Sequence, residues 1–112
     1  MQTSAKKLSP TNQDKISQQF ITLLADLKKP AECRAFFESF LTKTEQQVFA
    51  KRLGIIQLLN QGQSYDQIRK ELHVSSATIS TVAKQMDQAG IELTINKLKL
   101  EAWAEAWTEK LT

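Results

Sequence analysis

Short polar side chains and cations between Ser64 and Lys84 are the groups of this sequence best suited to binding a ligand. Serine and threonine hydroxyls both donate and accept hydrogen bonds, and arginine and lysine attract phosphate oxygens. A small side chain such as alanine lets a helix approach the edge of a base and can contact a thymine methyl group. This combination predicts contacts with DNA. The residues concerned are Ser64, Tyr65, Arg69, Lys70, Ser75, Ser76, Ala77, Thr78, Ser80, Thr81 and Lys84.

Other kinds of site find little support in the sequence. The single histidine, His73, and the single cysteine, Cys33, cannot form a usual zinc site, and one cysteine cannot form an internal disulfide. The dispersed glycines do not form a glycine-rich phosphate loop. We therefore expect no metal, no cofactor and no enzymatic activity.

Apolar residues around the polar set have the spacing of a helix-turn-helix unit. Two short helices that cross at a steep angle need apolar side chains where they meet. His73 stands where the turn usually has glycine, and histidine enters the left-handed backbone region more readily than most residues. We therefore predict a helix-turn-helix over about residues 64–89. Its apolar positions are filled by Ile68, Leu72, Val74, Ile79 and Val82.

Helical periodicity extends over the rest of the chain, and no segment has the alternation typical of a β-strand. The predicted fold class is therefore all-α, with a flexible arm over residues 1–11 and a single helical domain over 12–112. Capping residues, prolines and glycines set the expected helix ends. Helices are expected over about 12–29, from Pro30, from the Thr42 capping box to Asn60, from Ser64 to Leu72, from Ser75 towards Gln88 with Gly90 as the stop, and from Glu92 to Leu111.

The helix expected to end at Asn60 is apolar on most sides in its second half, with Leu53, Ile55, Ile56 and Leu58 among its residues. Such a helix must be covered on most sides. A chain of 112 residues forms one small domain and can hardly supply that cover alone. We therefore expect a partner chain to help.

The charge of the chain permits nucleic-acid binding without demanding it, because the formal net charge is only +3. No apolar run approaches the ~18 residues that would indicate a membrane span, and the polar start lacks the apolar core of a signal peptide. Together with the lone cysteine, this composition predicts a cytoplasmic protein without a membrane partner.

A plainer interpretation is that the serines and threonines only solvate the surface of a packing helix. Three features together favour DNA binding over that interpretation. They are the full match of apolar positions, the small polar face opposite them, and the Arg69-Lys70 pair on the preceding helix. Few cations line the face, so we expect a moderate affinity.

The segment from about Phe40 to Gln85 resembles the Trp repressor family, and is most similar to its Trp-repressor-like proteins of unassigned role. The family implies an all-helical, interlocked homodimer with two helix-turn-helix heads that bind double-stranded DNA. The matching stretches are LT at 41–42, KR at 51–52, LLNQG at 58–62, the turn GQSY at 62–65, KEL at 70–72 and ATIS at 77–80.

The resemblance also implies a place for a small-molecule effector, lined by Thr42, Arg52 and Thr78. Family members that sense tryptophan hold its carboxylate with two arginines and leave room for the indole with a glycine. Thr81 stands at the second arginine position and Val82 at the glycine. We therefore expect that tryptophan is not the effector and that Arg52 is a structural or phosphate-facing residue.

The favoured function is that of a sequence-specific, homodimeric transcriptional regulator, a repressor on a palindromic operator whose half-sites lie about one helical turn apart. One alternative is a helix-turn-helix module that docks on transcription or replication machinery. Another is the DNA-binding head of a mobile element or replication initiator. The apolar stripe Leu100, Trp103, Trp107 and Leu111 is expected to pack in the core or the dimer, or alternatively to recruit another protein.

Overall fold

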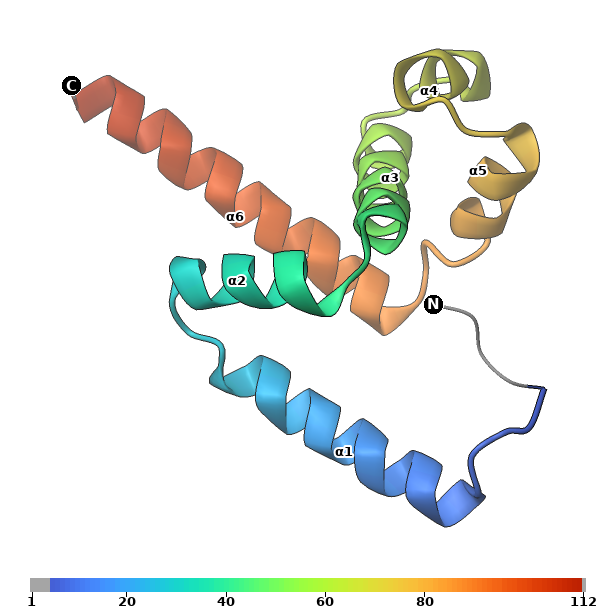
Figure 1. The fold of residues 1–112 in the computed structure, drawn as a ribbon. Helices are drawn as coiled ribbons and strands as arrows, with labels where there is room; N and C mark the ends of the chain where they lie inside the picture. Colours follow the sequence, from blue (N-terminus) through green and yellow to red (C-terminus); the bar gives the residue numbers. More distant parts are fainter. Residues whose placement is uncertain (1–4, 112) are drawn as a thin grey trace. The chain divides into compact units, whose positions relative to one another are not determined.

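A computed structural model describes the backbone of residues 5–111 and the side chains of residues 5–100. The described residues form helices joined by short linkers and contain no strand, which confirms the all-α prediction (Figure 1). The side chains of Trp103 and Trp107 lie outside this description. The helices are α1 (Pro10–Asp26), α2 (Pro30–Phe40), α3 (Lys43–Asn60), α4 (Tyr65–Leu72), α5 (Ser76–Ala83) and α6 (Ala89–Leu111).

The chain divides by its internal contacts into an amino-terminal unit, Met1–Gln47, and a carboxy-terminal unit, Val48–Thr112, with the boundary inside α3. In the amino-terminal unit α1 begins at Pro10, two residues before the expected start, because the Ser9 hydroxyl accepts a hydrogen bond from the Asn12 N–H at 3.2 Å. Lys29 is extended because it precedes a proline, so α2 starts afresh at Pro30.

The amino-terminal unit buries none of its described side chains. Three aromatic rings form its main apolar cluster. The ring centroids of Phe36 and Phe40 are 4.8 Å apart, and that of Phe20 lies 5.9 Å from Phe36 and 5.7 Å from Phe40. Phe40 is still 60% exposed. The aromatic cluster of Phe20, Phe36 and Phe40 therefore remains open to solvent on one side.

The predicted capping box at the start of α3 is present in full. The Thr42 hydroxyl accepts from the Glu45 N–H at 3.1 Å, and the Glu45 carboxylate accepts from the Thr42 N–H at 2.9 Å. These bonds to Thr42 lower the pKa of Glu45 below its usual range. The Gln46 side-chain amide also donates to the Glu38 and Leu41 carbonyls, which ties the end of α2 to the start of α3.

The lowered pKa of Glu45 predicts a pH dependence of stability. A carboxyl whose pKa falls on folding stabilises the protein above its unfolded pKa, and this contribution is lost as the pH falls through the folded value. We expect Glu45→Gln to lower the thermal midpoint at pH 7, and the difference from the wild type to shrink below about pH 4. Thermal melts followed by circular dichroism between pH 3 and pH 7 measure this. Glu92→Gln is the control, since it removes a carboxylate from the first turn of another helix, α6. A difference that stays constant with pH would contradict the prediction.

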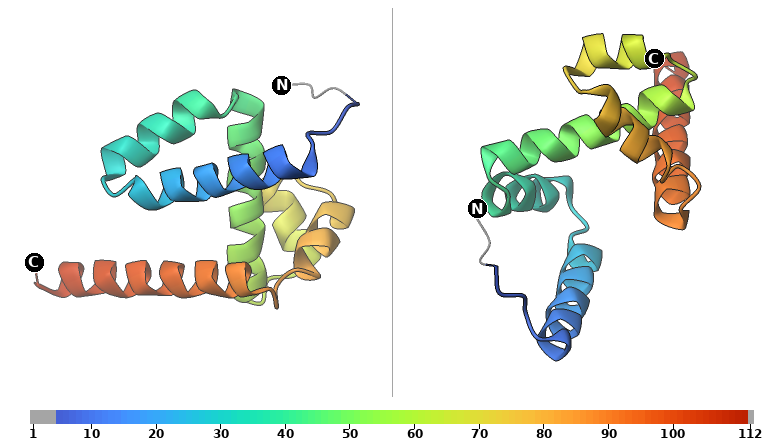
Figure 2. Two further views of the ribbon diagram at one scale, coloured as in Figure 1. Left: turned by 90° about the horizontal axis from the view of Figure 1, so that it is seen from below. Right: turned by 90° about the vertical axis from the view of Figure 1, so that its right-hand side faces the viewer.

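The core lies in the carboxy-terminal unit, where α3 and α6 cross and α4 and α5 pack beside α3 (Figures 1 and 2). Ile55, Ile68 and Ile79, one from each of α3, α4 and α5, have no exposed surface. Ile56 and Val82 complete the buried set. Partly buried apolar side chains pack against this core: Leu58, Leu59, Leu72, Val74, Met86, Ile91 and Ile95.

The end of α5 differs from the prediction, which places the stop at Gly90. The helix ends at Ala83, where Gln85 and Met86 bond instead to the carbonyls three residues before them, the tighter pattern of a terminating turn. Gly90 lies in the first turn of α6. The expected end of α3 at Asn60 is confirmed, and Gly62 follows it with a φ of 79°, in the left-handed region that glycine tolerates.

Candidate nucleic-acid interface

The apolar side of α5 fixes the helix against the core and leaves its other side at the surface. Ile79 is fully buried and Val82 is 4% exposed. On the opposite side Ser76, Ala77 and Thr81 are exposed, and Ser80 is partly buried. α5 therefore presents a face of small hydroxyl and methyl groups.

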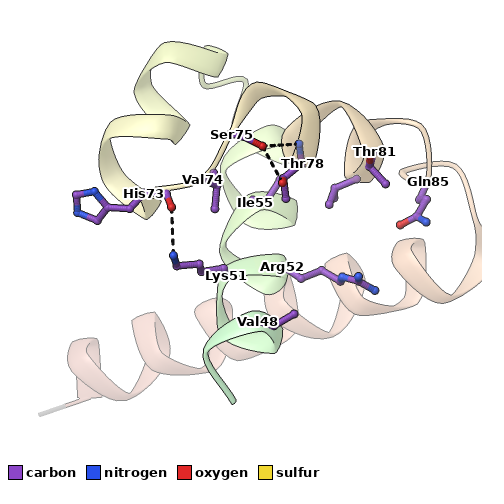
Figure 3. A pocket seen from close by; sticks show the side chains of 11 residues that line it. Val48, Lys51, Arg52, Ile55, His73, Val74, Ser75, Thr78, Thr81 and Gln85 are labelled. Carbon is purple, nitrogen blue, oxygen red and sulfur yellow. Dashed lines mark hydrogen bonds between the residues drawn. The ribbon is translucent and has the colours of Figure 1, made fainter. Parts of the chain in front are cut away.

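The start of α5 has the geometry of a capped helix. The Ser75 hydroxyl accepts from the Thr78 N–H at 3.1 Å and forms a second bond, of 2.9 Å, with the Thr78 hydroxyl (Figure 3). An α-helix offers no internal acceptor to its first N–H groups, which leaves those of Ser76 and Ala77 directed outwards. This end of α5 is suited to a phosphate.

The turn between α4 and α5 contains the left-handed residue that the sequence predicted. His73 has φ 53° and ψ 53°, and among the described residues it is the one non-glycine with a positive φ. Its N–H donates to the Arg69 carbonyl at 2.9 Å and closes the end of α4. The direction in which α5 leaves α4 depends on this residue.

The exposed side of α4 carries the expected cations. Lys70 is exposed, Tyr65 is 40% exposed, and Arg69 forms a surface ion pair with Asp66 one turn away. Surface pairs contribute ~1 kcal/mol or less, so Arg69 can exchange Asp66 for a phosphate at little cost. The Ser64 hydroxyl caps α4 by accepting from the Gln67 N–H at 3.2 Å.

A pocket of about 410 Å³ lies between α3 and the helix-turn-helix (Figure 3). Its lining includes two cations, Lys51 and Arg52, and no carboxylate. The hydroxyl-bearing residues Ser75, Thr78 and Thr81 form part of the opposite wall. The remaining lining residues are Val48, Ile55, His73, Val74, Val82 and Gln85.

Of the three predicted effector residues, two line this pocket and one does not. Arg52 and Thr78 both line the pocket. Thr42 belongs to the amino-terminal unit, where its hydroxyl caps α3. Val82 lines the pocket while its side chain fills the core, and the Thr81 hydroxyl donates to the Ala77 carbonyl at 3.0 Å.

Sequence reasoning missed two polar residues of this region, Lys51 and Gln85, which line the pocket beside the predicted ones. Lys51 belongs to the KR stretch at 51–52 that resembles the Trp repressor family, but the resemblance assigned a role only to Arg52, and Gln85 belongs to no recognisable motif. The available signal was helical spacing, since Lys51 precedes the core residue Ile55 by one turn and shares its side of α3. Gly54 lies on this side too, and a Cβ there would come within 3.0 Å of Leu72 Cδ1.

Two further features are absent from the part of the chain that the structure describes. No helix there is both long enough and apolar enough to cross a membrane. No group of three or more histidine, cysteine, aspartate or glutamate side chains is placed to hold a metal ion among those residues.

An all-helical chain whose capped, exposed α5 follows α4 across a left-handed turn belongs to the helix-turn-helix class of proteins. A family model described as Trp repressor protein matches residues 15–96. The chain therefore belongs to the Trp repressor family, as the sequence resemblance predicted. This is a family of DNA-binding regulators, not of enzymes.

The chain is also similar to a protein of Bacillus subtilis (strain 168) that is described as the uncharacterized protein YerC. The two are 33% identical over 86 residues, which cover 75% of this chain and 82% of YerC. No solved structure matches the chain significantly.

Proposed function

We propose that this protein is a homodimeric transcriptional repressor that binds a palindromic operator, in the cytoplasm, through α5 and the cations around it. The observation that carries this proposal is the exposed face of α5, held outwards by buried Ile79 and Val82. Ser76, Ala77 and Ser80 contact base edges, because short side chains let the helix enter the major groove.

The phosphate contacts come from groups on both sides of this face. The first turn of α5, with Ser75 and Thr78, binds one phosphate through its free N–H groups. Arg69 and Lys70 of α4, and Lys84 at the end of α5, supply the positive charge. Ser64, Tyr65 and Thr81 complete the contact surface. Phosphate contacts position the protein without distinguishing sequences.

The second copy in the dimer covers the apolar surface that one chain leaves open. The described part of the amino-terminal unit buries no side chain, and a helical unit without an interior is not stable alone. Large apolar side chains remain exposed along α1, α2 and α3. They include Ile16, Phe20, Ile21, Leu23, Leu24, Phe37, Phe40, Val48, Phe49 and Leu53.

The repressor does not respond to tryptophan. Arg52 offers one guanidinium to a carboxylate in the pocket, but the facing position on α5 is Thr81, whose hydroxyl already bonds within the helix. A lost charge-assisted hydrogen bond weakens binding by ~1.5–3 kcal/mol. Any effector that does bind meets Arg52 and Thr78 in the pocket.

Selection of oligonucleotides from a random pool at low salt tests the function as a whole. We expect a palindromic sequence with half-sites ~10 base pairs apart, and no change on addition of tryptophan. Failure to enrich any sequence would contradict the repressor function.

Two substitutions then separate the phosphate contacts from the base contacts. Lys84→Ala should weaken binding to all sequences alike and reduce the slope of log affinity against log salt by about 0.9, because one phosphate contact is lost. Ser76→Ala should leave that slope unchanged and relax the preference at one base pair of each half-site. Lys97→Ala removes the same charge from the exposed side of α6 and is the control. Equal effects of Lys84→Ala and Lys97→Ala would contradict the placement of DNA on α5.

The second candidate function is that of a module that docks on transcription or replication machinery. One observation favours it, namely that α5 itself carries no charged residue. Such a module would bind its partner with little dependence on salt. It would tolerate Thr78→Ala and lose the partner when Trp103 or Trp107 is replaced by alanine.

A further inference from the structure

The side chain of Lys51 contacts the turn between α4 and α5, although Lys51 belongs to α3 and not to the helix-turn-helix. Its Nζ donates to the His73 carbonyl at 3.1 Å, between residues 22 apart in the chain (Figure 3). Among the described residues, no other side chain outside Ser64–Lys84 forms a hydrogen bond with that segment. In the core, α3 packs against the segment through apolar side chains. The hydrogen bond from Lys51 is therefore the directional interaction that joins α3 to the turn between α4 and α5.

The acceptor of this bond is the residue whose conformation sets the angle between α4 and α5. His73 is left-handed, a conformation that is unfavourable for a residue with a Cβ. Its carbonyl follows the end of α4, where the last carbonyls of a helix lack partners and carry partial negative charge. A lysine ammonium at this place stabilises both the carbonyl and the left-handed backbone that presents it.

The neighbouring cation does not share this role. Arg52 points away from His73, towards the part of the pocket formed by Thr81 and Gln85 (Figure 3). The hydrophobic effect that holds the rest of the turn against α3 has no direction. Apolar packing alone therefore allows small rotations of α5 that a hydrogen bond to the turn resists.

We propose that Lys51 is a positioning residue for DNA binding, which fixes α5 in its binding orientation by holding the His73 carbonyl and does not contact DNA itself. The proposal rests on the proposed function of α5. It predicts that loss of the ammonium lowers operator affinity without removing a phosphate contact.

The test compares Lys51→Met, which keeps the length of the side chain, with Lys51→Arg, which keeps a donor. We expect Lys51→Met to weaken operator binding by about fivefold to tenfold, the size of one ordinary hydrogen bond, because solvent screens the charge of this exposed pair. The slope of log affinity against log salt should stay at the wild-type value. Lys51→Arg should restore most of the affinity. Lys43→Met removes the same charge from the exposed start of α3 and is the control.

Each outcome decides the proposal. A slope reduced by about 0.9 would show that Lys51 binds a phosphate, and an unchanged affinity would show that the bond to His73 is dispensable. Either result overturns the proposal. Lack of operator binding by the wild type would instead contradict the proposed function.

Hydrogen exchange of the free protein tests the same contact without DNA. The His73 N–H, bonded to the Arg69 carbonyl, should exchange about fivefold to tenfold faster in Lys51→Met, while the amide of the core residue Ile55 should not change. Substituting His73→Gly should reduce this difference, because glycine adopts the left-handed conformation without help. An unaltered rate at His73 would overturn the proposal.

Discussion

Ile79→Ala is expected to lower the free energy of unfolding of the carboxy-terminal unit by about 2–5 kcal/mol. Ile79 is fully buried between the α3 and α4 side chains Ile55 and Ile68. The buried set is small, so the cavity left by the missing atoms cannot be filled from elsewhere in the core. Small domains are stable by only about 5–15 kcal/mol, so this loss is a large part of the total.

Urea denaturation followed by circular dichroism measures the effect. Ile79→Val is the matched control, because it removes one methylene and should cost only about 0.5–1.5 kcal/mol. Operator binding should weaken in proportion to the unfolded fraction. Equal midpoints for the alanine and valine variants would contradict the assignment of Ile79 to the core.

Phe40→Asp is expected to convert the proposed dimer into monomers and to lower operator affinity by about 10²–10⁴-fold. Phe40 stacks on Phe36 and is nevertheless 60% exposed in a single chain. A carboxylate there would be buried without a partner in the dimer, at a high cost in desolvation. Two linked heads bind two half-sites far more tightly than one head, which accounts for the large loss.

Analytical ultracentrifugation gives the oligomeric state of this variant, and a titration with operator DNA gives its affinity. Phe40→Leu keeps an apolar side chain and should remain dimeric. A Phe40→Asp protein that sediments as a dimer would exclude the aromatic cluster of Phe20, Phe36 and Phe40 from the dimer interface.

The helix-turn-helix could be predicted from the sequence because its constraints are local and combine within one short segment. Steep crossing of α4 and α5 requires apolar residues at fixed spacings, and Ile68, Ile79 and Val82 occupy them as buried side chains. The turn requires a left-handed residue, and His73 has that conformation. The hydroxyls of Ser64 and Ser75 cap the helices as predicted.

Sequence reasoning failed in two situations. In one, no residue type marks the end of a helix. In the other, the contact joins residues that lie far apart in the chain. The segment Lys84–Gln88 ends α5 without glycine or proline, so periodicity extended the helix too far. The bond between Lys51 and His73 joins residues from different helices, and no local pattern predicts it. The role of Thr42 as the cap of α3 was predicted from its own neighbours, whereas its part in a pocket came only from family resemblance.

The open amino-terminal unit would make the proposed repression sensitive to how much of this protein the cell contains. Residues 5–47 have no interior in a single chain, so their stability in the proposed dimer rises with the concentration of the second copy. When growth dilutes the protein, operator occupancy would then fall more steeply than the protein concentration. Dilution alone, without any signalling molecule, would be enough to relieve repression.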